Sequence, residues 1–284
     1  MTLDPGRAGE QRRNLAAALK DLRRASGLSG ERLAVRCGMS QSKISRIETG
    51  KVLPSVADVQ QIINALGVDT GLARELLDLA SVANAEYEDV RASVRRGLHL
   101  RQRELAALEN GADHIRYFLP AMPSGLLQTP EYMRTAMSPP IDPVDGDVSQ
   151  TIALKIERQA VLYDESKRFD FLLTESAVRW RLCAPSVMAD QLDRIASVSR
   201  LSNVNIGIIP MSAQVVDAPF HTFTVYGAKL VTIELFTGRV VLRDPKDIDH
   251  YGRLFDFFYA ASPSEGDVRV MLEQWADDFR IPRH

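Results

Sequence analysis

Short apolar repeats at helical spacing, bounded by serines and glycines, fill the chain from Glu10 to about Ala85. A serine at a helix start accepts a hydrogen bond from a free backbone N–H, and a glycine beyond the helix end takes the left-handed conformation that closes it. The residues expected to begin helices are Ser29, Ser40 and Ser55, and those expected to end them are Gly27, Gly38 and Gly67. The pattern predicts an all-α domain of five short helices.

The rest of the chain mixes strand-like and helical patterns. Residues 86–118 are polar and mixed in charge, which predicts a connecting helical stretch. Runs rich in β-branched and aromatic residues predict strands at 168–175, 203–210, 220–227, 229–238 and 239–244. The last three follow one another too closely for crossover helices, so an antiparallel meander is expected. Helices are predicted to begin at Pro185, Pro245 and near Ser264.

These patterns predict an α+β fold divided along the chain. We expect an all-α five-helix domain at residues 10–85, a helical linker at 86–103 and a larger α+β domain with an antiparallel sheet at 104–284. At 284 residues the chain exceeds a single comfortable core, which favours two domains.

Charge is distributed unevenly between these parts. Residues 10–54 contain ten basic and four acidic residues, a formal charge of +6. Because the whole chain carries a formal charge of −2, the remainder carries −8. A basic segment on an acidic body can bind phosphates locally while the whole protein avoids indiscriminate binding.

The run GMSQSKISRIETGK, residues 38–51, has two different sides if it forms a helix from Gln41. At about 100° per residue, Ile44 and Ile47 fall on one side of that helix. The other side carries Gln41, Ser42, Ser45 and Arg46. Amide, hydroxyl and guanidinium groups are suited to reading the edges of bases. An ordinary amphipathic surface helix shows the same division, but the preceding capped helix and glycine turn are typical of a helix-turn-helix, whose second helix enters the major groove.

The segment LAAALKDLRRASGLSGERLAVRCGMSQSKISRIETGKVLPS closely resembles the Cro/repressor (XRE) class of helix-turn-helix domains, over roughly residues 10–68. The resemblance implies that Gln41, Ser42 and Arg46 contact bases of double-stranded DNA. Residues expected beside the DNA backbone are Ser29, Lys43, Ser45 and Lys51. Glu48 and Gly50 are expected to close the helix end. Gly30 stands where the family usually has a phosphate-contacting glutamine, so that contact is not expected here.

Residues from about 104 to 279 resemble the C-terminal domain of the WhiJ-like regulators of actinomycetes. The matching runs include IRYFLPAMPSGLLQTPEYMR, LLTESAVRWRL and YGRLFDFFYAASPSE. The resemblance implies a regulator paired with a small protein encoded nearby, in a manner likened to toxin–antitoxin systems. It supplies no ligand and no catalytic residue.

Several classes of protein lack support in the sequence. No apolar run approaches the roughly 20 residues that span a bilayer, and the N-terminus has no secretory signal, so we expect a cytoplasmic protein without membrane contact. Cys37 and Cys183 form no disulfide framework, and the five histidines lack metal-ligand spacing. There is no Gly-rich phosphate loop and no nucleophile elbow, so we expect no catalytic residue, metal, cofactor or enzymatic activity.

Three functions remain as hypotheses. The leading one is a sequence-specific transcriptional regulator that binds two-fold symmetric DNA as a homodimer. The second is an antitoxin-like module that holds a small partner protein and uses DNA binding only for autoregulation. The third, an enzyme fused to a DNA-binding domain, requires a convergent polar pocket in the second half. Glu175 and Arg179 have ion-pair spacing on a helix, either as a solvated pair or as part of such a pocket.

Overall fold

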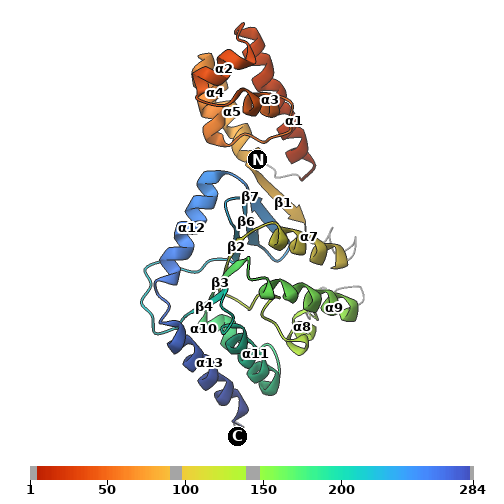
Figure 1. Cartoon of the computed structure of the whole chain (residues 1–284), viewed down its shortest axis with the longest axis vertical. Coiled ribbons are helices and arrows are strands. Elements are labelled where there is room, and N and C mark those ends of the chain that lie inside the picture. The colour runs from red at the N-terminus through yellow and green to blue at the C-terminus, as the bar shows by residue number, and fades with distance from the viewer. Residues whose placement is uncertain (1–4, 90–97, 139–147, 282–284) are drawn as a thin grey trace. The chain divides into compact units, whose positions relative to one another are not determined.

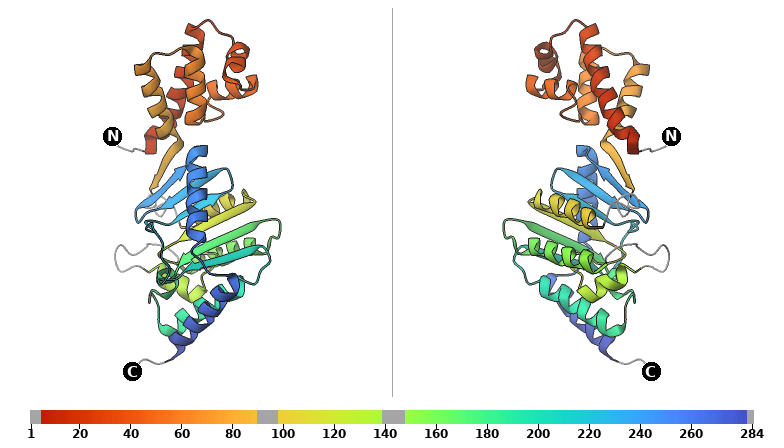
Figure 2. Two further views of the ribbon diagram at one scale, coloured as in Figure 1. Left: turned by 90° about the vertical axis from the view of Figure 1, so that its left-hand side faces the viewer. Right: turned by 90° about the vertical axis from the view of Figure 1, so that its right-hand side faces the viewer.

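The computed structural model describes residues 5–89, 98–138 and 148–281 (Figures 1 and 2). The chain divides into two compact units, which we call unit 1 and unit 2. Unit 1 contains Met1–Glu88 with Arg239–Ile248, and unit 2 contains Asp89–Gly238 with Asp249–His284. The boundaries expected at residues 10–85, 86–103 and 104–284 stay a prediction.

Three helices of unit 1 begin directly after the predicted serines, and two of these end at the predicted glycines. The helices of unit 1 are α1 (Pro5–Ala25), α2 (Gly30–Cys37), α3 (Gln41–Glu48), α4 (Val56–Leu66) and α5 (Thr70–Asn84). Ser29, Ser40 and Ser55 cap α2, α3 and α4, each accepting a hydrogen bond from a backbone N–H three residues later. Gly38 and Gly67 close α2 and α4 with left-handed φ angles of 63° and 65°.

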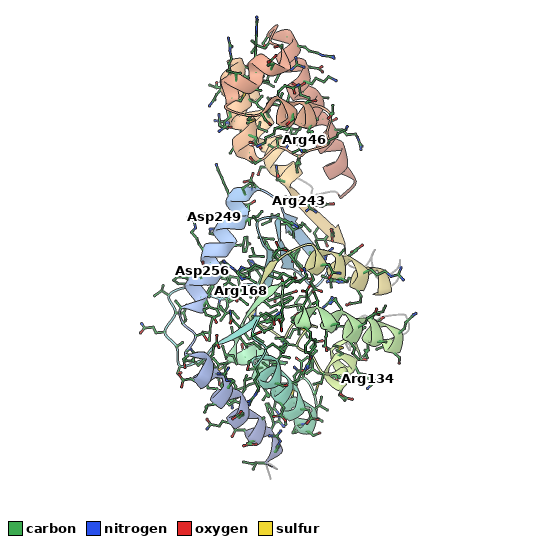
Figure 3. All side chains as sticks on the ribbon, in the orientation of Figure 1. Arg46, Arg134, Arg168, Arg243, Asp249 and Asp256 are labelled. Carbon is green, nitrogen blue, oxygen red and sulfur yellow. The ribbon has the colours of Figure 1, made fainter. Side chains whose placement is uncertain are left out.

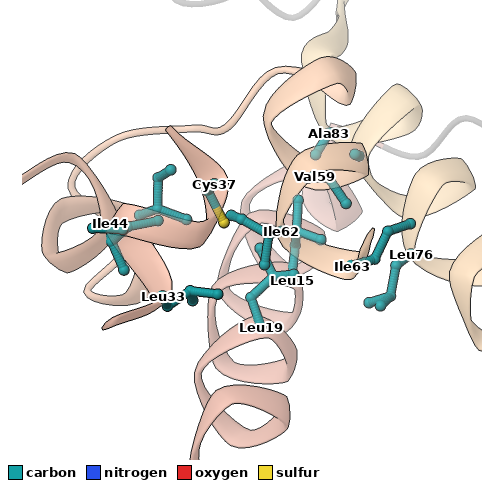
Figure 4. Packing of buried hydrophobic residues seen from close by; sticks show 13 residues of the cluster. Leu15, Leu19, Leu33, Cys37, Ile44, Val59, Ile62, Ile63, Leu76 and Ala83 are labelled. Carbon is teal, nitrogen blue, oxygen red and sulfur yellow. The ribbon is translucent and has the colours of Figure 1, made fainter. Parts of the chain in front are cut away.

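Apolar side chains from all of these helices meet in one core (Figure 4). Leu15 and Leu19 come from α1, and Ile62 comes from α4. Ile44 and Ile47 of α3 are 1% and 0% exposed, as expected from their spacing. Burying each such side chain contributes roughly 1.5–3 kcal/mol, so α3 is held firmly against its neighbours.

Strands β1 (Ala85–Asp89) and β7 (Gly238–Leu242) are neighbours in the sheet order. In unit 1, Arg239 pairs with Glu88, and the backbone N–H of Arg243 donates to the carbonyl of Asn84 at 3.0 Å. Residues 86–89, which the sequence predicts to be helical, therefore form part of a strand. Their partner lies some 150 residues away in sequence, so the local sequence carries no signal of it. Residues 90–97 lie outside the described part of the chain.

Unit 2 contains a mixed sheet with the strand order β6-β5-β2-β3-β4. The strands are β2 (His114–Leu119), β3 (Arg168–Thr174), β4 (Val204–Ile209), β5 (Phe223–Tyr226) and β6 (Leu230–Glu234). The predicted β5–β6 hairpin is antiparallel, with a left-handed Gly227 at its turn. The α+β class is confirmed, but the sheet is not wholly antiparallel, because β2, β3 and β4 run parallel through helical crossovers.

Strand β2 was missed by the sequence analysis, which placed residues 86–118 in a helical stretch. It lies between β3 and β5 in the middle of the unit 2 sheet, with Ile115 and Phe118 buried. A central strand covered on both faces lacks the alternation of apolar and polar residues that marks an exposed strand, so its pattern resembles that of a buried helix.

Helices cover the sheet of unit 2. They are α7 (Leu98–Asn110), α8 (Pro130–Ala136), α9 (Val148–Arg158), the 3-10 helix η1 (Gln159–Tyr163), α10 (Glu175–Arg179), α11 (Pro185–Val198), α12 (Pro245–Tyr259) and α13 (Glu265–Arg280). The predicted helix starts at Pro185, Pro245 and Ser264 are confirmed. Phe258 of α12 stacks on Phe118 of β2 with ring centres 4.8 Å apart. None of the described helices is long and apolar enough to cross a membrane.

Candidate nucleic-acid interface

Helices α2 and α3 are joined by a turn that depends on glycine. The Gly38 N–H contacts the carbonyls of Ala34 and Val35 at the end of α2, and the φ of Gly38 is 63°. Side chains other than glycine rarely adopt this backbone conformation. Ser40 follows and caps α3, its Oγ accepting from the N–H of Lys43 at 3.2 Å. The three-residue turn thus fixes where α3 begins.

The outward side of α3 carries the four polar residues expected there. Gln41, Ser42, Ser45 and Arg46 are exposed, while Ile44 and Ile47 face the core. Figure 3 shows Arg46 on this helix. Its Nε donates to the carbonyl of Ser42 at 3.3 Å, a long contact that a stronger acceptor can replace. Gln41 has no hydrogen-bond partner within the described residues, so its amide is available to a ligand.

The residues expected beside the DNA backbone do not form one group of free donors. Lys43 Nζ lies 2.7 Å from Asp58 Oδ1, so its charge is already paired across to α4. Ser29 Oγ accepts from the N–H of Arg32 as the cap of α2. Ser45 and Lys51 are exposed, with Lys51 just beyond the end of α3. Lys51 is therefore better placed than Lys43 to offer an unpaired charge.

Glu48 has a structural contact that the sequence analysis missed. Its Oε1 and Oε2 accept from Nε and Nη2 of Arg23 on α1, at 2.5 and 2.8 Å. Nη1 of Arg23 also donates to the carbonyl of Leu28 at 2.9 Å. The hydrogen bond to Glu48 raises the pKa of Arg23. This two-point contact ties α3 to α1 and limits the rotation of α3, and residues 25 positions apart give no local signal of it.

A pocket lies in unit 2, well separated in sequence from α3. It has a volume of about 500 Å3 and is lined by residues of α7, α9 and η1. Glu109 and Arg158 line it, with Glu109 Oε2 and Arg158 Nε 3.3 Å apart. Its buried charges are therefore paired with each other. Among the described residues, no group of three or more His, Cys, Asp or Glu side chains could hold a metal ion.

Comparison with known protein families gives two matches. Residues 14–77 match a helix-turn-helix domain, and residues 102–274 match a domain of unknown function, DUF5753. The second match covers more than half of the chain. The chain belongs to the DUF5753 family. Its N-terminal part is a helix-turn-helix domain, as the sequence predicted, whereas the XRE and WhiJ-like resemblances stay predictions.

Two solved structures show a distant likeness to this DUF5753 chain. A phospholipase D family member, Nuc from Salmonella typhimurium, matches with a TM-score of 0.32 and 10% identity, over 57% of this chain and 88% of that protein. TrmBL2, an archaeal chromatin protein, matches with a TM-score of 0.29 and 10% identity, over 83% of this chain and 87% of that protein. Such values support no functional argument. Curated proteins give no significant match.

Proposed function

We propose that this DUF5753 chain is a sequence-specific DNA-binding transcriptional regulator that reads the major groove with α3. The observation that carries the proposal is the exposed row of Gln41, Ser42, Ser45 and Arg46 on a helix pinned by Ile44 and Ile47. Arginine binds the O6 and N7 atoms of guanine through two hydrogen bonds, and glutamine binds the N6 and N7 atoms of adenine in the same way. The surrounding charge of +6 supplies the attraction to phosphates that dominates affinity for DNA.

The proposed regulator acts by binding and not by catalysis, and it acts as a homodimer. Helix-turn-helix proteins that dimerise place two recognition helices about one turn of DNA apart, so their operators are two-fold symmetric. The antitoxin-like alternative places a small partner protein on unit 2. Under that alternative, the loss of DNA binding leaves the main activity of the chain intact.

Arg46→Ala tests the proposal through affinity. We expect full-length Arg46→Ala to bind its selected duplex with about 1–3 kcal/mol less free energy, which is roughly 5- to 150-fold weaker, because one base contact is lost. Fluorescence anisotropy with labelled duplex measures the change. Arg253→Ala is the matched control, since this arginine is 72% exposed on α12. Unchanged affinity in Arg46→Ala contradicts the assignment of α3.

Lysine substitutions test the role of the ion pair to Asp58. We expect Lys51→Ala to lower the slope of log K against log salt by about one, because an unpaired charge that meets a phosphate releases a counterion. Lys43→Ala should lower the slope less, since Asp58 already neutralises Lys43 at 2.7 Å. Binding titrations at several salt concentrations measure the slope for each variant. A larger change in slope for Lys43→Ala than for Lys51→Ala shows that the ion pair between Lys43 and Asp58 opens on DNA.

A further inference from the structure

Large apolar side chains gather where the strands of unit 2 end. Trp180 follows α10, the short helix that begins directly after β3. Met211, Val216 and Phe220 belong to the segment between β4 and β5. Leu235 and Phe236 follow β6. All six are exposed, and the three aromatic residues Trp180, Phe220 and Phe236 are 70%, 83% and 110% exposed. We call these six residues the apolar edge.

Strand directions place the apolar edge at one end of the sheet. Strands β3 and β4 run parallel, so the segments that follow them leave from the same end. Strand β5 runs antiparallel to β2, which is itself parallel to β3, so the segment entering β5 lies at that end too. Strand β6 is antiparallel to β5 and finishes there. The six residues therefore come from segments at the same end of the sheet.

Hydrogen bonds connect these segments to one another. The N–H of Met211 donates to Glu175 Oε2 at 2.9 Å, and Glu175 also pairs with Arg179 beside Trp180. Where the chain enters β5 and leaves β6, the N–H of Glu234 donates to the carbonyl of Thr222 at 3.0 Å. The β5–β6 register ends with the pair Phe223 and Ile233, and Leu235 and Phe236 lie in the turn that follows, where the N–H of Leu235 donates to the carbonyl of Gly238 at 2.8 Å. Glu175 and Arg179 thus form an ion pair that supports a surface segment.

The size of the apolar edge matches that of a protein interface. A fully buried aromatic side chain removes about 150–250 Å2 from water, so the exposed fractions of the three aromatic residues represent roughly 400–650 Å2. The summed area is comparable with that of the largest single patch on a typical monomer, about 300–600 Å2. With the three aliphatic residues added, the edge approaches the roughly 800 Å2 that each partner buries in a standard interface.

We propose that the apolar edge binds the same edge of a second copy of this chain and forms the homodimer. The inference rests on the proposed function, because a two-fold symmetric operator requires two helix-turn-helix domains held together. A two-fold interface uses one patch twice, so the patch must complement itself. Exposed residues of opposite charge, Arg181 and Asp217, lie in the same segments as Trp180 and Val216. In a two-fold contact, Arg181 of one copy can pair with Asp217 of the other.

Substitutions within the edge test the proposal on the full-length chain without DNA. Sedimentation velocity between about 1 and 100 µM should show a wild-type dimer. Phe236→Glu and Phe220→Glu should each weaken the dimer at least about 30-fold, because aromatic residues at the centre of an interface dominate its affinity. Val270→Glu is the matched control, since Val270 is 61% exposed on α13 and lies outside the edge. Circular dichroism verifies that each variant is folded.

A charge exchange tests the two-fold arrangement. Arg181→Glu and Asp217→Arg should each weaken the dimer, and the double variant should restore it, because the exchanged charges again meet in opposite pairs. A monomeric wild type at 100 µM, or a dimer that survives both Phe236→Glu and Phe220→Glu, overturns the proposal. If these variants weaken the dimer but the wild type binds no duplex, the interface is supported and only the proposed function is overturned.

Discussion

The two units hold their charged side chains in different ways. In unit 1 the ion pairs Arg23–Glu48 and Lys43–Asp58 join α1 to α3 and α3 to α4, with side chains that are 10% to 37% exposed. In unit 2 the Glu109 and Arg158 side chains are 2% and 7% exposed, and Tyr117 donates to Glu109 Oε1 at 2.9 Å. The core shared by the five helices of unit 1 is apolar, whereas the interior of unit 2 includes a buried pair of opposite charges.

Burial changes the chemistry of the unit 2 groups. It raises the pKa of Glu109, against the opposing charge of Arg158 and the hydrogen bond from Tyr117. Burial and the nearby charges of Arg158 and Arg101 lower the pKa of Lys155 to about 8, and Lys155 Nζ donates to Gln128 Oε1 at 3.1 Å. These groups interact across three or more segments. Substitutions among them should therefore lower the free energy of unfolding more than substitutions of single helix caps in unit 1.

The largest expected effect is that of Arg158→Leu. Removing this guanidinium leaves Glu109 buried without its partner charge, which costs about 3–5 kcal/mol in the free energy of unfolding. Urea unfolding followed by tryptophan fluorescence reports on unit 2 specifically, because Trp180 and Trp275 both belong to it. Arg200→Leu is the control: its pair with Glu273 is 67% and 58% exposed, so the loss should stay below about 1 kcal/mol. Equal losses of unfolding free energy in Arg158→Leu and Arg200→Leu contradict the contrast between buried and exposed charges.

A smaller, pH-dependent effect is expected from Lys155. Folding lowers its pKa from 10.5 to about 8, so between these values the unfolded chain binds more protons than the folded chain. The stability of unit 2 should therefore rise as the pH rises from about 8 to about 10.5, by at most about 3 kcal/mol. Lys155→Met should remove this rise. Urea unfolding of the wild type and of Lys155→Met at pH 7.5 and pH 10 measures this rise in stability. An equal change in stability in the two proteins contradicts the burial of a charged Lys155.

The smallest expected effect lies in unit 1, at the cap of α3. Ser40→Ala removes the acceptor for the N–H of Lys43 and should destabilise α3 by about 1 kcal/mol. Hydrogen exchange of the α3 amides should accelerate about 5-fold, since exchange reports local opening. Ser45→Ala, an exposed change in the same helix, should leave the exchange nearly unchanged. A loss above about 3 kcal/mol from Ser40→Ala means that α3 depends on its cap more than on its core contacts.

The two units also differ in how much of their structure the sequence predicts. The unit 1 helices are marked by Ser29, Ser40 and Ser55 and by Gly38, whose effects act within three or four residues. The exposed side of α3 follows from helical spacing alone. Contacts between distant residues were missed: Lys43 was expected beside the DNA backbone, and its pairing with Asp58, 15 residues away, was not predicted.

Unit 2 was less predictable because its structure depends on contacts between distant segments. The hairpin of β5 and β6 was predicted, since a short turn joins its strands. Strand β2 was not, because both of its neighbours in the sheet come from more than 50 residues further along the chain. Phe220 and Phe236 fall inside the predicted strand segments 220–227 and 229–238, yet both are exposed. Exposure of this kind depends on packing that the local sequence does not determine.

Selection of random duplexes by full-length wild type and by Arg46→Ala tests most directly whether α3 reads DNA. The wild type should enrich a defined two-fold motif. Arg46→Ala should keep that motif except at one base pair in each half-site, where its preference disappears because the guanidinium no longer contacts the base. An identical motif from both proteins, or no enrichment by the wild type, contradicts the account.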